Sequence, residues 1–301
     1  MAKSALVGVD LGGTKIYTAV ADLRGRIISE VIVPTGAERG PAAVIDEIVR
    51  SVDDALCAAG IGRRALKAVG AGAPGPVVFA RGLIADPPNL PRWCNVPLGA
   101  ILEERLGTTV LVDNDANLAG LAEVRFGAAK GFRDVVYVTV STGIGGGIIF
   151  GGEVFRGADG AAGEVGHMTV LPGGPRCNCG NRGCLEAVAS GTAFRRLHGY
   201  TTKDAAERIA RGGVSGRKAR RDIDELAEWL GLGLANLANI LNPQVIVVGG
   251  GLSNLGPILF VPLRKAVKKY GFSIAGRRVK VLRAKLGKRV GVMGAIALAL
   301  E

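Results

Sequence analysis

Features of membrane, secreted and repetitive proteins are missing from this sequence of 301 residues. Apolar residues make up 48% of it, yet no stretch approaches the roughly eighteen uninterrupted apolar residues of a membrane span, and the first residues form no secretory apolar run. The 47 glycines are clustered rather than periodic, which excludes a collagen-like chain. These absences predict a globular cytoplasmic protein without a membrane partner, long enough for two domains.

Cysteine is scarce, and its distribution argues against a disulfide framework. Only five cysteines are present, and three of them fall within residues 177–184. An odd, crowded set of this kind is typical of metal ligands in a reducing compartment. The other two, Cys57 and Cys94, are expected to be small apolar fillers or surface thiols.

Acidic residues are absent from one long segment near the C-terminus. Residues 264–289 carry eleven Lys and Arg residues and no Asp or Glu, within a chain of formal net charge +12. Such a segment could attract nucleic acid or polyphosphate, but a scattered set on amphipathic elements is more often a solvated face. The solvated face is therefore the favoured interpretation.

The phosphate-binding motif G-x-x-x-x-G-K-[ST] is also missing, so an ordinary P-loop enzyme is disfavoured. Three glycine-rich turns follow short apolar runs instead. Backbone N–H groups of such turns can point together at an anion, so three of them could surround a nucleotide, although each alone is as consistent with a tight turn. The predicted nucleotide-binding residues are Asp10, Gly12, Gly13, Thr14 and Lys15 in the first turn, Thr142, Gly143 and Gly145 in the second, and Gly249, Gly250 and Gly251 in the third.

The first two turns repeat one module of strand, Gly-Thr turn and strand. This repeat predicts an α/β fold with two related domains that face a shared cleft. A small N-terminal domain is expected over residues 1–117 and a larger one over residues 118–290. The apolar tail at 291–301 predicts a final helix that packs back on the first domain.

Polar residues follow the apolar pair Val110 and Leu111. Asn114 and Asp115 are therefore expected at the end of a strand and the start of a helix. A carboxylate at this place could accept the proton of a sugar hydroxyl, while positioning and charge neutralisation supply most of the rate. The alternative is that an Asp or Asn here only caps the helix.

The strongest local signal is a set of three cysteines with one histidine. Cys177, Cys179 and Cys184 follow His167, which lies ten residues before the first of them. Three thiolates and one imidazole make a closed tetrahedral zinc site with no position for a catalytic water, so a structural Zn²⁺ ion is predicted. Glu164 and Glu186 flank this set, and their spacing argues against a merely solubilising role.

Together these motifs resemble the ROK family of repressors and sugar kinases. The resemblance covers essentially the whole chain and rests on residues 10–15, on Glu164-Val165-Gly166-His167, and on the C-x-C-G-x-x-G-C-x-E block at 177–186. It implies the actin-like (ribonuclease H-like) two-domain sugar kinase fold. It further implies ATP as the donor, with Mg²⁺ near Asp10.

The resemblance also assigns roles to individual residues. It implies that Asp115 is the catalytic base and that His167 and the three cysteines hold zinc. The implied sugar-binding residues are Asn89, Asn114, Asp115, Glu164, His167 and Glu186.

Phosphorylation of the 6-hydroxyl of glucose is the expected reaction, because Asn89, Trp93 and the Glu-Val-Gly-His run look most like the glucokinase branch. Fructose, N-acetylmannosamine or N-acetylglucosamine as acceptor, and polyphosphate as donor, stay open. A sugar-responsive repressor is least favoured, because a DNA-reading domain would precede the first strand, which is expected from Ala5. The expected partners are a hexose, a nucleotide and one or three further copies of the chain, in a homodimer or homotetramer, with no specific nucleic acid.

Overall fold

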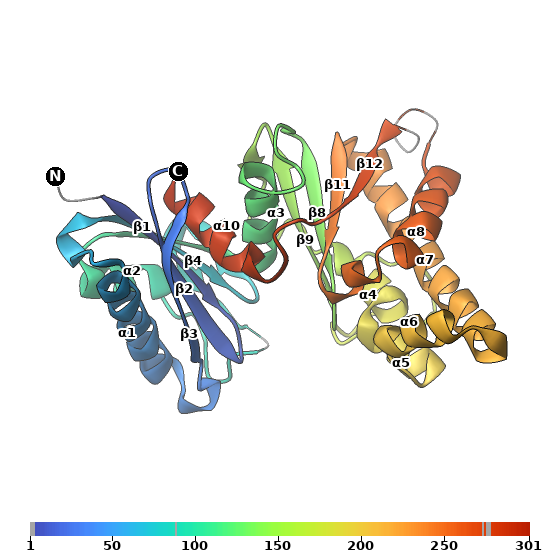
Figure 1. Ribbon diagram of the computed structural model, residues 1–301, viewed down its shortest axis with the longest axis horizontal. Helices are drawn as coiled ribbons and strands as arrows, with labels where there is room; N and C mark the ends of the chain where they lie inside the picture. Colours follow the sequence, from blue (N-terminus) through green and yellow to red (C-terminus); the bar gives the residue numbers. More distant parts are fainter. Residues whose placement is uncertain (1–3, 88, 273, 275–277) are drawn as a thin grey trace. The chain divides into compact units, whose positions relative to one another are not determined.

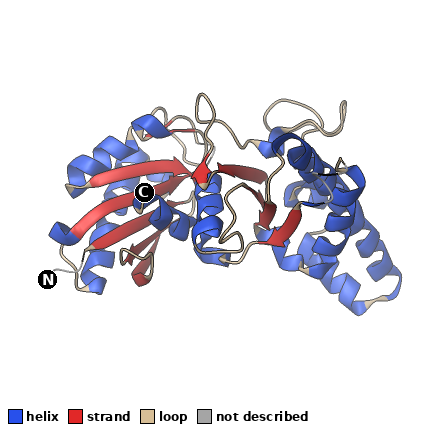
Figure 2. Cartoon of the chain, turned by 90° about the horizontal axis from the view of Figure 1, so that it is seen from above, coloured by secondary structure: helices blue, strands red, loops and turns tan. Residues whose placement is uncertain are grey.

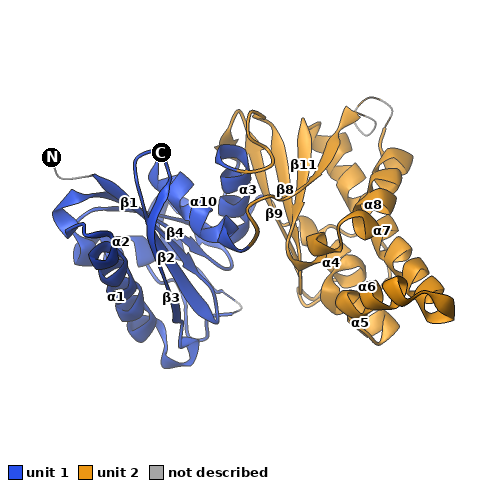
Figure 3. Cartoon of the chain, in the orientation of Figure 1, with its two compact units in different colours: residues 1–126, 155–162, 288–301 blue, residues 127–154, 163–287 orange. Residues whose placement is uncertain are grey.

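The computed structural model describes residues 4–301 apart from 88, 273 and 275–277. The chain divides into two compact units (Figure 3): unit 1 comprises Met1–Phe126, Phe155–Ala162 and Lys288–Glu301, and unit 2 comprises Gly127–Val154 and Gly163–Gly287. The boundary expected at residue 117 falls inside helix α3 (Asp115–Arg125), whereas the division lies after Phe126. Helix α3 thus stays in the same unit as the strand that precedes it.

Unit 1 is built on a five-stranded mixed sheet (Figure 1). Its strands, in the order β3-β2-β1-β4-β7, are Ile27–Pro34, Lys15–Ala21, Ala5–Leu11, Leu66–Ala73 and Thr109–Asn114. Strands β1, β2 and β3 are antiparallel neighbours, while β1, β4 and β7 run parallel. Parallel strands need helical crossovers, which are supplied by α1 (Pro41–Ala59) and α2 (Leu98–Leu106). A small hairpin of β5 (Val77–Val78) and β6 (Leu83–Ile84) lies between β4 and α2 in the sequence.

The apolar C-terminal segment forms α10 (Val290–Ala299), which packs on α3, β1 and β4. Glycines make this close approach feasible: a Cβ atom on Gly70 of β4 would lie 2.0 Å from the carbonyl oxygen of Ala295, and one on Gly294 would lie 2.2 Å from that of Leu118. Any larger residue at either position would push the helix away. The last residues of the chain are thereby built into unit 1.

Unit 2 repeats the strand order of unit 1. Its sheet has the order β10-β9-β8-β11-β12, formed by Glu153–Val154, Ile144–Phe150, Val135–Val140, Val245–Gly249 and Lys280–Arg283. In both units the first strand of an antiparallel hairpin with a glycine turn pairs on its free edge with a parallel strand, and a second parallel strand follows that one. The helices of this unit are α4 (Leu185–Ala189), α5 (Gly191–His198), α6 (Thr202–Arg211), α7 (Gly213–Leu241) and α8 (Pro257–Tyr270).

Each unit has its own apolar core. Figure 2 shows the helices and strands that contribute to these cores. In unit 1, α1 buries Val44, Ile48 and Val52 on one face, at the spacing of an amphipathic helix. In unit 2, α7 ends at Leu241, and its C-cap residue Asn242 adopts φ 45° directly before Pro243, since proline disfavours helical geometry in the residue ahead of it. Among the described residues, none of the helices is long and apolar enough to cross a bilayer.

Candidate functional site

In unit 1, the carboxyl ends of the parallel strands collect the candidate residues at one sheet edge. The register pairs Asp10 of β1 with Gly72 of β4, and Gly72 with Asp113 of β7. Paired residues project to the same face, so the two aspartates share a row with a glycine between them. The next residue of β7 is Asn114, followed by Asp115. This edge is where open α/β sheets commonly bind ligands.

The first glycine turn links β1 to β2 and lies beside the Asn89 loop. The Gly12 N–H donates to the Lys15 carbonyl at 3.0 Å, and the Thr35 hydroxyl donates to the Gly12 carbonyl at 2.6 Å. A Cβ atom on Gly13 would lie 2.8 Å from the carbonyl oxygen of Asn89, so only glycine fits. The structure thus brings Asn89 against the turn, with Thr14, Lys15 and Asn89 itself exposed.

Asp10 lies under the first turn of α10. A Cβ atom on Gly291 would be 2.4 Å from a carboxylate oxygen of Asp10, so the two groups are in close contact. Burial raises the pKa of Asp10 above its usual range, and the positive charge of Lys15 opposes that shift only in part. A desolvated carboxylate that lacks full compensation is a suitable ligand for a hard cation such as Mg²⁺.

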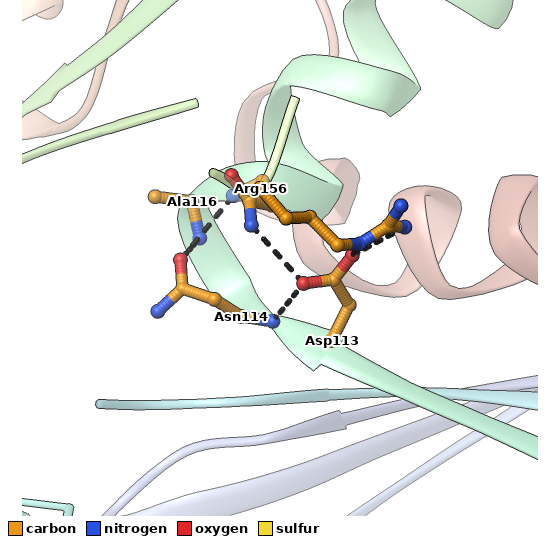
Figure 4. Close-up of polar contacts among 5 residues, drawn as sticks. Asp113, Asn114, Ala116 and Arg156 are labelled. Atoms are coloured by element: carbon orange, nitrogen blue, oxygen red, sulfur yellow. Dashed lines mark hydrogen bonds and ion pairs between the residues drawn. The ribbon is translucent and has the colours of Figure 1, made fainter. Parts of the chain in front are cut away.

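Asn114, which is labelled in Figure 4, and Asp115 form the junction of β7 and α3. Asn114 is the N-cap of α3: its Oδ1 accepts from the N–H groups of Ala116 at 2.9 Å and Asn117 at 3.3 Å, and its Nδ2 donates to the Gly75 carbonyl at 2.9 Å. The capping role considered for this position is therefore present. Asp115 is the first helical residue, and it is exposed. Of the two predicted residues, Asn114 is thus part of the helix cap, whereas Asp115 lies on the surface.

Sequence reasoning missed Asp113 and Arg156, the best-organised polar pair of this edge. Arg156 Nε donates to Asp113 Oδ2 at 2.9 Å, and the two residues lie 43 positions apart in the sequence. Arg156 lies in a glycine-rich loop, and nothing in the sequence around it indicates which residue it contacts. Only the adjacency of Asp113 to the strand end gave a signal, and it was read for Asn114 and Asp115 alone.

In unit 2, the four predicted zinc ligands converge. The ligand atoms of His167, Cys177, Cys179 and Cys184 all lie within 4.8 Å of one another. Sγ of Cys177 is 3.6 Å from Nδ1 of His167, and Sγ of Cys179 is 3.7 Å from that of Cys184. Cys57 and Cys94 are exposed thiols outside this cluster. The donor set and its compactness fit a tetrahedral Zn²⁺ ion.

The loop that carries the cysteines has little freedom. Gly183 adopts φ 72°, and a Cβ atom on it would lie 1.6 Å from the Leu171 carbonyl oxygen, so no other residue fits. Burial raises the pKa of Cys184 to about 12, and the neighbouring thiols of Cys179 and Cys177 raise it further through hydrogen bonds and charge; none of these causes is a positive charge. A divalent cation would supply that charge and hold the sulfur as thiolate.

The two ring nitrogens of His167 face different groups. Nδ1 points to Cys177, whereas Nε2 is 3.9 Å from an oxygen of Glu164. If Nδ1 binds the metal, Nε2 keeps a proton in a fixed direction next to a carboxylate. The Glu164-Val165-Gly166-His167 segment also packs on β9, because a Cβ atom on Gly166 would be 2.1 Å from the Ile144 carbonyl oxygen.

Glu186 connects the cysteine loop to the second glycine turn. Its Oε2 accepts the N–H of Ile144 at 2.8 Å, and its Oε1 lies 4.0 Å from Sγ of Cys177. A Cβ atom on Gly143 would be 2.4 Å from Oε2, so glycine is needed there. One carboxylate thus contacts the predicted metal loop and the predicted phosphate turn.

The second and third glycine turns are neighbours within unit 2. A Cβ atom on Gly250, which has φ 77°, would lie 2.4 Å from the Val140 carbonyl oxygen, and one on Gly249 would lie 2.3 Å from the Tyr137 hydroxyl. A Cβ atom on Gly251 would be 3.5 Å from the Ser141 hydroxyl oxygen. Thr142 is exposed, and Gly143 and Gly145 are half-buried. The backbone of two predicted phosphate turns therefore gathers at one end of this sheet.

The described residues of the basic segment 264–289 lie largely on the C-terminal half of α8 and on β12. Several of them are held by local partners: Arg264 donates to the Val281 carbonyl, Lys269 pairs with Glu228, and Arg283 donates to the side chain of Asn254. Arg289 belongs to unit 1 and pairs with Glu30. These contacts support the solvated-face interpretation.

Known proteins resemble this chain over nearly its full length. The model of the ROK family matches residues 6–301. A glucokinase of Streptomyces coelicolor is 40% identical, over 98% of this chain and 97% of its own length. Two solved structures are similar: a ROK hexokinase from Thermus thermophilus (39% identity, TM-score 0.84, 98% and 97% of the two chains) and a ROK family glucokinase from Streptomyces griseus with glucose and AMPPNP (37%, 0.80, 98% and 99%).

Proposed function

The chain belongs to the ROK family, and on that premise we propose that it is an ATP-dependent glucokinase that transfers the γ-phosphoryl group to the 6-hydroxyl of glucose. The expected resemblance and the actin-like two-domain fold are confirmed by the similar structures. The observation that carries the proposal is the β7–α3 junction, where an exposed Asp115 follows Asn114, the N-cap of α3, in a chain 40% identical to a glucokinase.

Asp115 is proposed as the general base. Its carboxylate would accept the proton of the sugar hydroxyl as that oxygen attacks the γ-phosphorus in line with the departing nucleotide oxygen. The protein forms no covalent bond to the substrate in such a transfer, so the rate depends on the orientation of the sugar hydroxyl and the phosphate and on neutralising the phosphate charge. The position of Asp115 at the start of α3 suits the first requirement.

The nucleotide is proposed to lie against the three glycine turns. Their N–H groups would contact the phosphates, and Lys15 would add a positive charge beside the first turn. Asp10, with its incompletely compensated carboxylate, would hold Mg²⁺ directly or through water. Support for ATP as the donor comes from the Streptomyces griseus glucokinase structure, which contains AMPPNP.

The sugar is proposed to contact Asn89, Glu164, His167 and Glu186. Asn114 is also expected to reach the sugar, although its carboxamide already makes two cap hydrogen bonds and one to the Gly75 carbonyl. A zinc ion held by His167 and the three cysteines would act as a structural crosslink of its loop. The protein side chains would recognise the sugar: Nε2 of His167 offers a hydrogen-bond donor to its hydroxyl groups, and the carboxylates of Glu164 and Glu186 offer acceptors.

A coupled assay of the purified protein tests the proposal. Glucose, fructose, mannose and the N-acetylated hexosamines are compared with ATP and then with polyphosphate as donor. We expect the highest kcat/KM for glucose with ATP. Faster turnover of an N-acetylhexosamine than of glucose at low concentration would replace glucose in the proposal. Faster turnover with polyphosphate than with ATP at physiological salt would replace ATP. No turnover of any sugar would contradict it.

A further inference from the structure

The buried carboxylate of Asp113 is held from two sides. It is 1% exposed, and its Oδ1 accepts from the N–H of Asn114 at 2.7 Å and from Nδ2 of Asn117 at 3.0 Å. Its Oδ2 accepts from Nε of Arg156 at 2.9 Å and lies 2.8 Å from a second guanidinium nitrogen (Figure 4). The carboxylate of Asp113 thus contacts the last residue of β7, the first turn of α3 and Arg156, which is distant in the sequence.

Arg156 is itself anchored by more than this ion pair. It belongs to Phe155–Ala162, which is part of unit 1 although its neighbours in sequence lie in unit 2. Its guanidinium carbon lies 3.6 Å from the centre of the Phe79 ring, and its side chain is 22% exposed. A stacked, largely desolvated guanidinium has few alternative positions, so it offers a rigid support.

We propose that Arg156 is a positioning residue for phosphoryl transfer: through Asp113 it fixes the junction of β7 and α3 that presents Asp115 to the sugar hydroxyl. The inference rests on the proposed role of Asp115 as base. Asp115 lies two residues after Asp113 and begins the helix, so any rotation of the junction turns its carboxylate. A displacement of about 1 Å at a reacting group can cost roughly a hundredfold in rate.

Removing either partner leaves a buried, unpaired charge, whereas removing both does not. The test therefore compares Arg156→Met, Arg156→Lys, Asp113→Asn and the double variant Asp113→Asn/Arg156→Met. We expect kcat to fall about 10- to 100-fold in Arg156→Met, with KM for glucose and ATP within about threefold of the wild type. Arg156→Lys should recover only part of the loss, because an ammonium cannot place two nitrogens on one carboxylate oxygen while stacking on Phe79.

The pH profile gives a readout that a merely structural role would not move. Arg156 is the charged group in contact with Asp113, and the other two donors to it are neutral amides. In Arg156→Met the uncompensated Asp113 charge should raise the pKa of Asp115 and shift the acid limb of kcat upward by about half a unit. Asp113→Asn should shift it downward, and the double variant should return it towards the wild type.

Arg26→Met is the matched control, since Arg26 Nε donates to Asp22 at 2.7 Å in an exposed turn of the same unit. It should leave kcat and the acid limb unchanged. A folded Arg156→Met variant with wild-type kcat, or single variants whose acid limbs shift in the same direction, would overturn the inference. If thermal unfolding shows that Arg156→Met does not fold, wild-type kcat in Arg156→Lys overturns it instead. Undiminished turnover in Asp115→Asn contradicts the proposed base itself, so the two failures are distinguishable.

Discussion

The two units fix their functional ends by different physical means, although their sheets have the same strand order. In unit 1 a buried ion pair, Asp113 with Arg156, holds the strand end that precedes Asp115. In unit 2 the carboxylate of Glu186 joins the cysteine loop to the second glycine turn. It accepts the N–H of Ile144 and fills the space beside Gly143. The ion pair of unit 1 holds a strand end, whereas Glu186 of unit 2 holds a segment of backbone through the N–H of Ile144. The comparison predicts that damage in unit 1 lowers kcat and damage in unit 2 raises KM.

The largest effect should come from Asp115→Asn. The amide keeps the volume and the hydrogen-bonding capacity of the side chain but cannot accept a proton from the sugar hydroxyl. Loss of a general base typically removes about 10²–10⁴ of the rate, so kcat should fall by that factor, with sugar affinity within several-fold. Initial rates in the coupled assay and glucose binding by calorimetry measure the two quantities. A variant that keeps half of wild-type kcat would refute the role of base.

The next largest effect is expected from Cys184→Ser, which removes a buried ligand of the predicted zinc site. Elemental analysis should show about one zinc per chain in the wild type and close to none in the variant. KM for glucose should rise at least about tenfold, because the positions of His167 and Glu186 both depend on the loop. Substitutions beside metal ligands typically reduce affinity or activity by at least that factor. KM for ATP should rise less, through the contact of Glu186 with Ile144. A zinc-free variant with normal sugar KM would show that the loop is a remote structural element.

The sequence predicted best where a function needs a local pattern. The spacing of Cys177, Cys179 and Cys184 was sufficient to foresee a cluster, because metal ligands on one loop must be close in sequence. The apolar spacing of Val44, Ile48 and Val52, which α1 buries on one face, is likewise a local pattern. The contact of Arg156 with Asp113 joins residues far apart in the chain, and no local pattern encodes such a pair.

Close approaches of backbone were equally hidden from the sequence. A glycine is consistent with a turn, a bulge or a packing contact, so Gly70 could not be read as the place where α10 lies on β4. Gly143 was assigned to phosphate binding alone, whereas the structure shows that it also makes room for Glu186. In both positions the deciding factor is what lies opposite the missing Cβ atom, which only the three-dimensional structure shows.

A smaller effect separates the two tasks of Glu186. Glu186→Ala removes the acceptor of the Ile144 N–H, whereas Glu186→Gln keeps an oxygen that can accept it. One lost hydrogen bond of ~1 kcal/mol corresponds to about fivefold, so KM for ATP should be about fivefold higher in the alanine than in the glutamine variant. Both should bind glucose less tightly, because the charge is lost in each. Equal KM for ATP in the two variants would mean that Glu186 does not hold the phosphate turn.

The smallest effect concerns stability and returns to unit 1. Burial raises the pKa of Asp10, so the folded state binds a proton at this carboxyl more tightly than the unfolded state does. A raised carboxyl pKa means that ionisation at neutral pH costs folding free energy, and that this cost disappears below the usual pKa of about 4. Asp10→Asn should therefore raise Tm at pH 7 by about 2 °C in a metal-free buffer, with a gain that shrinks towards pH 4. The same variant should lose activity if Asp10 holds Mg²⁺, which would place stability and function in opposition at one residue. Scanning calorimetry of both proteins across this pH range decides the matter, and a lower Tm of the variant at pH 7 would show that the Asp10 carboxylate is compensated after all.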